Sequence, residues 1–174
     1  MMTDREPIET KNLDRYGNDT LPWSRPRDLL DAIDPAEPLT WFLGTTGPDG
    51  RPHAAGVGAL WDDGEVFFTS GDVTRKSKNL ASNPAASLSV RLPGLDLVFE
   101  GEAVRVTDRA TLEAVAKRYN DGGWPATVDG EAFTAPFSAP SAGPPPWQVY
   151  RLRLGTIYGV AGEEPHGATR WRFA

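Results

Sequence analysis

Three basic residues stand where a helix is expected to begin. The segment VFFTSGDVTRKSKNLASNP, residues 66–84, runs from a short β-like stretch into a helix with Thr74 as its N-cap. Arg75, Lys76 and Lys78 crowd the first turn of that helix. A helix N-terminus carries partial positive charge and unpaired N–H groups, so each cation there costs roughly 0.3–1 kcal/mol. A bound phosphate reverses that cost, because N–H groups, dipole and side chains then act together.

The same cations have a second interpretation. They could form a solvated helix face that pairs with some of the 24 acidic residues of the chain. A run of charge at a helix start has no fixed spacing rule that would separate the two interpretations. We favour the phosphate site and keep the solvated face as the alternative.

A run of small residues, AAGVGA at 54–59, precedes this segment. It is unusual for a strand, because it lacks β-branched bulk and because glycine weakens a strand interior. One interpretation is that a flat ring lies against the backbone there. The other is a tight barrel corner or close strand packing. The residues alone do not separate the two.

The composition points to a small-molecule partner. The chain has 174 residues and a net charge of −6, which opposes a nucleic-acid or anionic-membrane surface. No apolar stretch approaches the roughly 18 residues of a membrane span, and the start MMTDREPIETKN is unlike a signal peptide. We therefore expect a cytoplasmic protein with neither a nucleic-acid nor a membrane partner.

Residues that do chemistry unaided are scarce. The chain has no cysteine, so it offers no thiolate nucleophile and no cysteine metal site. His53 and His166 are the only histidines and have no carboxylate at ligand spacing, so we expect no metal. The glycines of residues 44–58 show no dinucleotide fingerprint, and neither histidine belongs to a serine-nucleophile motif. Redox chemistry must then come from a cofactor.

Short strands separated by turn residues dominate the chain, which predicts a mainly β, α+β fold. We expect an antiparallel barrel of six to seven strands with two or three peripheral helices. The expected strands cover residues 39–46, 51–61, 65–70, 85–92, 95–107, 147–160 and 168–173, and the expected helices cover 26–33, the segment after Thr74 and the segment after Thr107 or Asp108.

The chain divides into an irregular N-terminal arm, residues 1–24, and one domain, residues 25–174. Within the domain, the third helix has an apolar stripe that includes Tyr119, which we interpret as core with no cofactor role. A Gly/Pro-rich loop at 120–147 is expected to be either a lid or a packed cover. We interpret its aromatic residues, which include Trp124, as packing anchors.

The small-residue strand after DGRPH, followed by FFTSGDVTRKSKNLASNPAASLSV, resembles the pyridoxamine 5'-phosphate oxidase-like flavoproteins of the split β-barrel class. The likeness covers about residues 39–107 and returns at ATRWRF near the end of the chain. It implies that residues 25–174 form an FMN-binding split barrel. It also implies a homodimer that binds its cofactor at the subunit interface.

The resemblance implies a set of cofactor-binding residues in three groups. Ring and ribityl chain would contact His53, Ala54, Ala55, Gly56 and Val57; the phosphate end would contact Phe68, Thr69, Ser70, Thr74, Arg75 and Lys76, with Asn79 on the following helix; and Trp171 and Arg172 would lie near the ring. No side chain is nominated as a catalytic acid or base.

The expected activity is that of a flavin- or deazaflavin-dependent oxidoreductase. The resemblance implies hydride transfer through FMN to or from a small conjugated substrate. TRKSKN and TRWRF also look like the family branch that uses coenzyme F-420, which is the alternative cofactor. Ala168 and Arg170 replace the substrate-binding arginine and histidine of the oxidase, so oxidation of pyridoxamine phosphate itself is not expected. The alternative function is a non-catalytic flavin or tetrapyrrole carrier.

Overall fold

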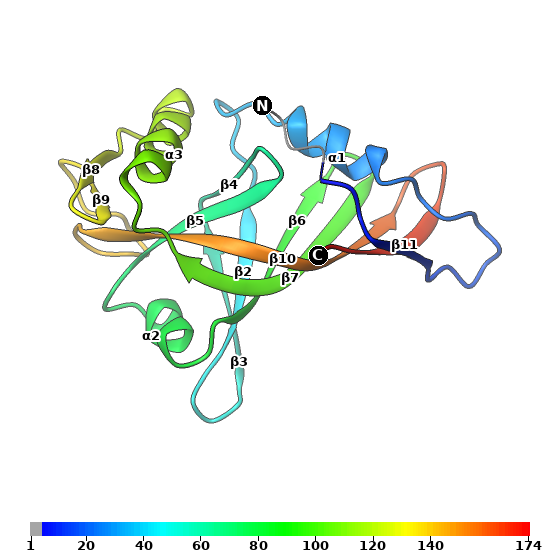
Figure 1. Cartoon of the computed structure of the whole chain (residues 1–174), viewed down its shortest axis with the longest axis horizontal. Helices are drawn as coiled ribbons and strands as arrows, with labels where there is room; N and C mark the ends of the chain where they lie inside the picture. The colour runs from blue at the N-terminus through cyan, green and yellow to red at the C-terminus, as the bar shows by residue number, and fades with distance from the viewer. Residues whose placement is uncertain (1–4) are drawn as a thin grey trace.

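The computed structural model describes residues 5–174, which form an eleven-stranded antiparallel sheet with three helices (Figure 1). The strands are β1 Glu9–Asn12, β2 Trp41–Thr46, β3 Pro52–Val57, β4 Ala59–Asp62, β5 Glu65–Gly71, β6 Ala85–Leu92, β7 Leu95–Arg105, β8 Thr127–Asp129, β9 Ala132–Thr134, β10 Trp147–Ala161 and β11 Gly167–Arg172. The helices are α1 Ser24–Asp31, α2 Arg75–Ser82 and α3 Arg109–Asp121.

The main path of the sheet runs β1-β11-β10-β7-β6-β2-β3, and β5 joins it through β10. The sheet is not closed, because β3 pairs with β2 alone and β4 pairs with β5 alone. This open, curved sheet with helices outside it confirms the predicted α+β split barrel. Seven strands lie on the main path, and the remaining four bring the total above the predicted six to seven.

Two predictions about strands are wrong. The expected strand over residues 51–61 breaks at Gly58, so that β3 pairs with β2 and β4 pairs with β5. The arm at 1–24 is not wholly irregular, because β1 pairs with β11, while residues 1–4 lie outside the described part of the chain. The short β1 escaped prediction because it is polar and mostly exposed, which leaves no apolar alternation to detect.

The long strand β10 connects the two halves of the protein. It pairs with β7 over residues 150–161, with β11 over 156–161 and with β5 over 147–152, and it meets β9 at Trp147. A register shift in its pairing with β7, between Leu154 and Thr156, lets the strand bend at that point. The barrel interior is filled by large apolar side chains, among them Trp41, Phe99 and Ile157, each at most 1% exposed. A bent, fully packed strand thus supports both sides of the barrel.

The loop at 120–147 is a packed cover with structure of its own. It contains the hairpin β8–β9, and its residues join a second apolar cluster beneath α3. Phe133 and Trp147 are at most 1% exposed in this cluster, as is Leu112 of α3. Asp108 is the N-cap of α3, and its side chain accepts a hydrogen bond from the Thr111 N–H at 2.9 Å, as predicted for a cap.

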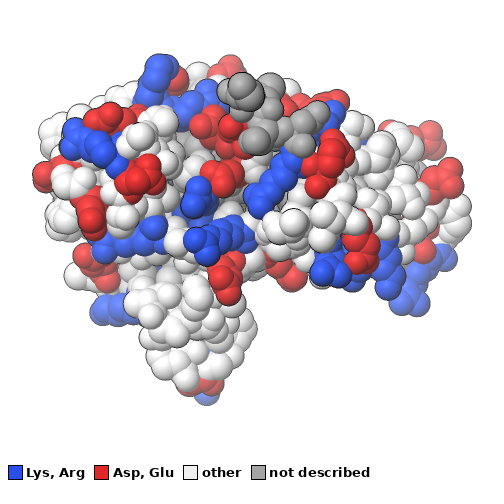
Figure 2. Space-filling model, viewed as in Figure 1, with Lys and Arg blue, Asp and Glu red and all other residues white. Residues whose placement is uncertain are grey.

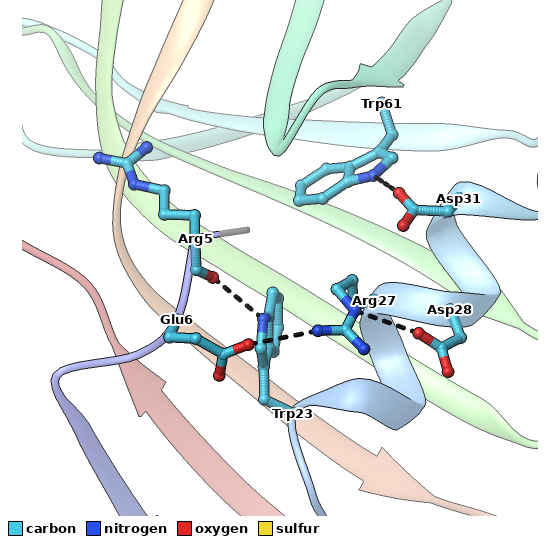
Figure 3. A network of polar contacts seen from close by, with 7 residues as sticks. All are labelled: Arg5, Glu6, Trp23, Arg27, Asp28, Asp31 and Trp61. Atoms are coloured by element: carbon cyan, nitrogen blue, oxygen red, sulfur yellow. Dashed lines mark hydrogen bonds and ion pairs between the residues drawn. The ribbon is translucent and has the colours of Figure 1, made fainter. Parts of the chain in front are cut away.

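Helix α1 is fastened to the barrel by polar contacts (Figure 3). Trp61 of β4 donates from Nε1 to the Asp31 carboxylate at 2.7 Å. Trp23, just before the helix, donates to the Arg5 carbonyl at 3.1 Å. These bonds satisfy indole N–H groups beside the core and fix the orientation of Trp61.

Basic and acidic side chains are interspersed over the face seen in Figure 2, and the lobe formed by the β2–β3 hairpin is mostly uncharged there. Within residues 5–174, the helices are all too short or too polar to cross a membrane.

Candidate cofactor-binding site

The start of α2 is held against β5 by a set of hydroxyl groups. Thr74 is the N-cap, as predicted, and accepts from the Ser77 N–H at 3.3 Å. Ser77 donates to Ser70 at 2.7 Å, and the Ser70 and Thr74 hydroxyls lie 2.9 Å apart. Thr74 also donates to the Gly71 carbonyl at 2.8 Å. Each hydroxyl has one proton to donate, so this network commits Ser70 and Thr74 to supporting the helix.

Of the three cations at the helix start, Lys76 is the one that faces inward. It is 5% exposed, and its Nζ lies 3.4 Å from the Ser141 carbonyl oxygen. No acidic group among residues 5–174 forms an ion pair with it. Burial lowers the pKa of the Lys76 ammonium, because the charged form loses its hydration. A buried cation without a counter-charge is costly, and an anionic ligand would supply the missing partner.

The neighbouring cations lie elsewhere. Lys78 is exposed, and so is Arg75, whose guanidinium reaches toward the β2–β3 turn at Gly47. Neither residue lines the cavity described next. Arg75 lies one helical step, about 100°, from Lys76, and Lys78 lies two steps, about 200°, which places both exposed cations on other sides of the helix. Arg75 and Lys78 therefore fit the solvated helix face, and Lys76 alone of the three is left as the candidate for a phosphate.

Lys76 lies in the wall of a cavity of about 310 Å³, a volume at the lower end for small-molecule sites. Strands β3 to β5 form one side, and α3 with the loop at 120–147 forms the other. Aromatic and aliphatic side chains make up most of the remaining wall: Trp41, Trp61, Trp124, Tyr119, Leu39, Leu60 and Ile33. Ala139, Ser141 and Ala142 complete the wall on the loop side.

The small-residue strand has open space beside it. A Cβ built on Gly56 or on Gly58 would meet no atom within 4 Å, and both residues line the cavity. Protein packing therefore does not require glycine at either position. Gly58 does form the corner between β3 and β4, so the corner interpretation holds there, whereas close strand packing does not. The open face is free for a ligand to approach the backbone.

The structure brings together four of the predicted site residues: Gly56, Val57, Thr69 and Lys76 line the cavity. His53, Ala54 and Ala55 precede them on β3.

Two other predicted site residues point into the protein. Phe68 is fully buried and stacks on Tyr150 with ring centroids 5.2 Å apart, so only its backbone could meet a ligand. Asn79 donates to the Thr45 hydroxyl at 3.0 Å and joins α2 to β2.

Trp171 and Arg172 belong to β11, which lies away from α2 and Lys76. Figure 1 shows β11 and α2 at opposite sides of the barrel. Arg172 pairs with Glu9 of β1 at 2.9 Å, and Trp171 is fully buried against Trp23, with ring centroids 5.6 Å apart. A single chain therefore does not bring these residues to Lys76.

Sequence reasoning missed the wall contributed by α3. Tyr119 packs against the second apolar cluster, as predicted for this stripe, and it also lines the cavity. Trp124 was interpreted as a packing anchor, and it does contact Trp147 at a centroid distance of 5.4 Å, but it also lines the cavity. The sequence offered one signal for this position: tyrosine carries a hydroxyl group, which a purely apolar stripe does not need.

These residues fit a ligand with a phosphate at one end and a flat ring. Lys76 could supply a buried charge, without an acidic partner among residues 5–174, for the phosphate, and β3 could supply an open backbone surface for the ring. The aromatic side chains opposite suit a conjugated ring system. FMN has this combination of groups.

A family model described as pyridoxamine 5'-phosphate oxidase matches residues 29–160. Two curated relatives named pyridoxine/pyridoxamine 5'-phosphate oxidase are similar to part of the chain. The one from Acidothermus cellulolyticus is 38% identical over 106 residues, which cover 56% of this chain and 47% of the relative. The one from Bacteroides thetaiotaomicron is 36% identical over 98 residues, covering 53% and 46%. The matches thus span about half the length of these relatives.

Solved structures share the fold at low sequence identity. A pyridoxamine 5'-phosphate oxidase-related, FMN binding protein from Nostoc punctiforme is 16% identical, with a TM-score of 0.56 over 86% of this chain and 90% of that one. A NimC/NimA family protein from Clostridium acetobutylicum is 15% identical, with a TM-score of 0.57 over 84% and 91%. Because the family model covers most of the barrel, the chain belongs to the pyridoxamine 5'-phosphate oxidase family, a family of flavin-binding oxidoreductases.

Proposed function

We propose that the protein is an oxidoreductase that binds FMN in the cavity beside Lys76 and acts on a small conjugated substrate. The observation that carries the proposal is the buried Lys76 ammonium, which lacks an acidic partner among residues 5–174 and faces a cavity bordered by open glycine backbone. Bound FMN would supply the hydride transfer that the side chains of this protein cannot perform.

The chain's own residues would bind and orient the cofactor. Lys76 would hold the phosphate, and Thr69 would contact the phosphate or the adjoining chain from β5. The backbone of Gly56 and Val57 would lie along the ring, in keeping with their place in the cavity wall. Trp61, held by its hydrogen bond to Asp31, would help to exclude water from that wall.

The charges that line the cavity do not suit two phosphate groups, one on the cofactor and one on the substrate. Lys76 and Arg118 are the basic residues that line it. Arg118 already pairs with Asp62, at 2.9 Å. One free buried cation fits one phosphate, which we assign to the cofactor. We therefore propose a substrate without a phosphate group rather than pyridoxamine 5'-phosphate.

We also propose a homodimer in cells, with a cytoplasmic location. Strand β11, which carries Trp171 and Arg172, lies on the other side of the barrel from α2, which carries Lys76, so these two residues could reach a bound ring only from a second copy. Coenzyme F-420 is the alternative cofactor, because it also joins a flat ring to a phosphate-bearing chain.

The test is equilibrium titration of purified protein with FMN and with F-420, followed by absorbance and fluorescence. Saturable FMN binding, with reduction of the bound flavin by a nicotinamide donor or a substrate, supports the proposal. Preference for F-420 replaces the cofactor assignment. Tight binding without turnover of any conjugated substrate favours a carrier, and binding of neither cofactor contradicts the proposal.

A further inference from the structure

Tyr119, near the end of α3, reaches the corner of the cavity. Its hydroxyl donates a hydrogen bond to the Gly58 carbonyl at 2.8 Å. The ring is held edge-on by Trp124, with centroids 5.0 Å apart at 79°, and by Phe133, at 6.1 Å and 84°. The side chain is therefore fixed by packing, and its hydroxyl has a definite target.

The target is a corner of the cavity wall that lies between two strands. Gly58 connects β3, which pairs only with β2, to β4, which pairs only with β5. No ladder hydrogen bond spans this break, and glycine leaves the backbone conformationally free. The bond from Tyr119 ties the corner to α3. A tyrosine phenol is protonated at neutral pH, and burial moves the pKa of Tyr119 further upward, so the group is a hydrogen-bond donor there.

We propose that Tyr119 is a positioning residue for the cofactor, an inference that rests on the proposed function. By holding the Gly58 carbonyl, it sets the orientation of the backbone from Gly56 to Gly58, the open surface assigned to the ring. It does not contact reacting atoms in this role. It acts through the strand, and it links that strand to the loop at 120–147 through Trp124.

Tyr119→Phe separates this role from packing. The variant keeps the ring and its contacts with Trp124 and Phe133, and it removes only the hydroxyl. The matched control is Tyr16→Phe, which changes the same atom on a side chain that is 95% exposed. Three quantities are compared: the FMN dissociation constant, the absorbance spectrum of bound FMN, and amide hydrogen exchange of residues 56–60 without ligand.

The expected result for Tyr119→Phe is FMN binding weaker by about 3- to 10-fold, as for loss of one neutral hydrogen bond. A shifted spectrum of the bound flavin and faster exchange at residues 56–60 should accompany it, with the unfolding midpoint close to that of Tyr16→Phe. An unchanged dissociation constant and spectrum would overturn the inference, even if exchange is faster. If the wild-type protein binds no FMN, the proposed function fails first, and the exchange experiment then reports only whether Tyr119 supports the corner.

Discussion

Lys76→Met removes the buried charge while keeping an unbranched side chain that is only one atom shorter. Lys76 is 5% exposed, and its one hydrogen bond among the described residues, to the Ser141 carbonyl, is long at 3.4 Å. A hydrogen bond from a charged group contributes about 1.5–3 kcal/mol. FMN should therefore bind about 10- to 150-fold more weakly to the variant, since 1.4 kcal/mol corresponds to a factor of ten. The ligand-free protein should unfold at the same or a higher urea concentration, because methionine has no charge to desolvate.

The assay is quenching of FMN fluorescence on titration with protein, alongside urea unfolding without ligand. Lys78→Met is the matched control, since it removes an exposed cation from the same helix. Equal FMN affinity of the two variants would refute the phosphate assignment. A loss of more than about 2 kcal/mol of unfolding free energy in Lys76→Met would instead show that the buried charge supports the fold.

Two further predictions concern the open strand and the effect of pH. Gly56→Ala should weaken FMN binding at least about tenfold while leaving the unfolding free energy unchanged or raised by about 0.4–1 kcal/mol. The control is Gly162→Ala, which also has open space around it and should leave FMN binding intact. Equal FMN affinities of the two variants by titration would contradict the ring assignment. Burial lowers the pKa of Lys76, so between that lowered pKa and the ordinary one the unfolded chain retains a proton that the folded chain loses. The unfolding free energy of the wild type should therefore rise relative to that of Lys76→Met as pH approaches about 10, and FMN binding to the wild type should weaken. If the urea midpoints of the two proteins change with pH in the same way, this linkage is excluded.

Local signals predicted the elements that carry the site. A cap at Thr74 and a stop before Pro84 define α2, and the structure places the helix at Arg75–Ser82. The strand at Ala85–Leu92 matches its prediction, because apolar residues alternate there between turn signals. These features depend on residues that are close together in the sequence, so the sequence alone predicts them.

Features that depend on the three-dimensional arrangement were not predictable. The sequence does not say which of Arg75, Lys76 and Lys78 faces inward, since that depends on how the helix packs against β2 and β5. The hydrogen bond from Tyr119 to Gly58 was not predictable for the same reason, because the two residues are 61 positions apart in the sequence. Corners and distant contacts of this kind leave no periodic pattern.

The most direct test of the central claim is a comparison of FMN with riboflavin, which lacks the phosphate, by isothermal titration calorimetry on the wild-type protein. The Lys76 assignment predicts that FMN binds at least about tenfold more tightly, the contribution of one charge-assisted contact. Equal affinities would show that the ring is bound without help from Lys76 and would contradict a phosphate-anchored site, as would failure of both ligands to bind.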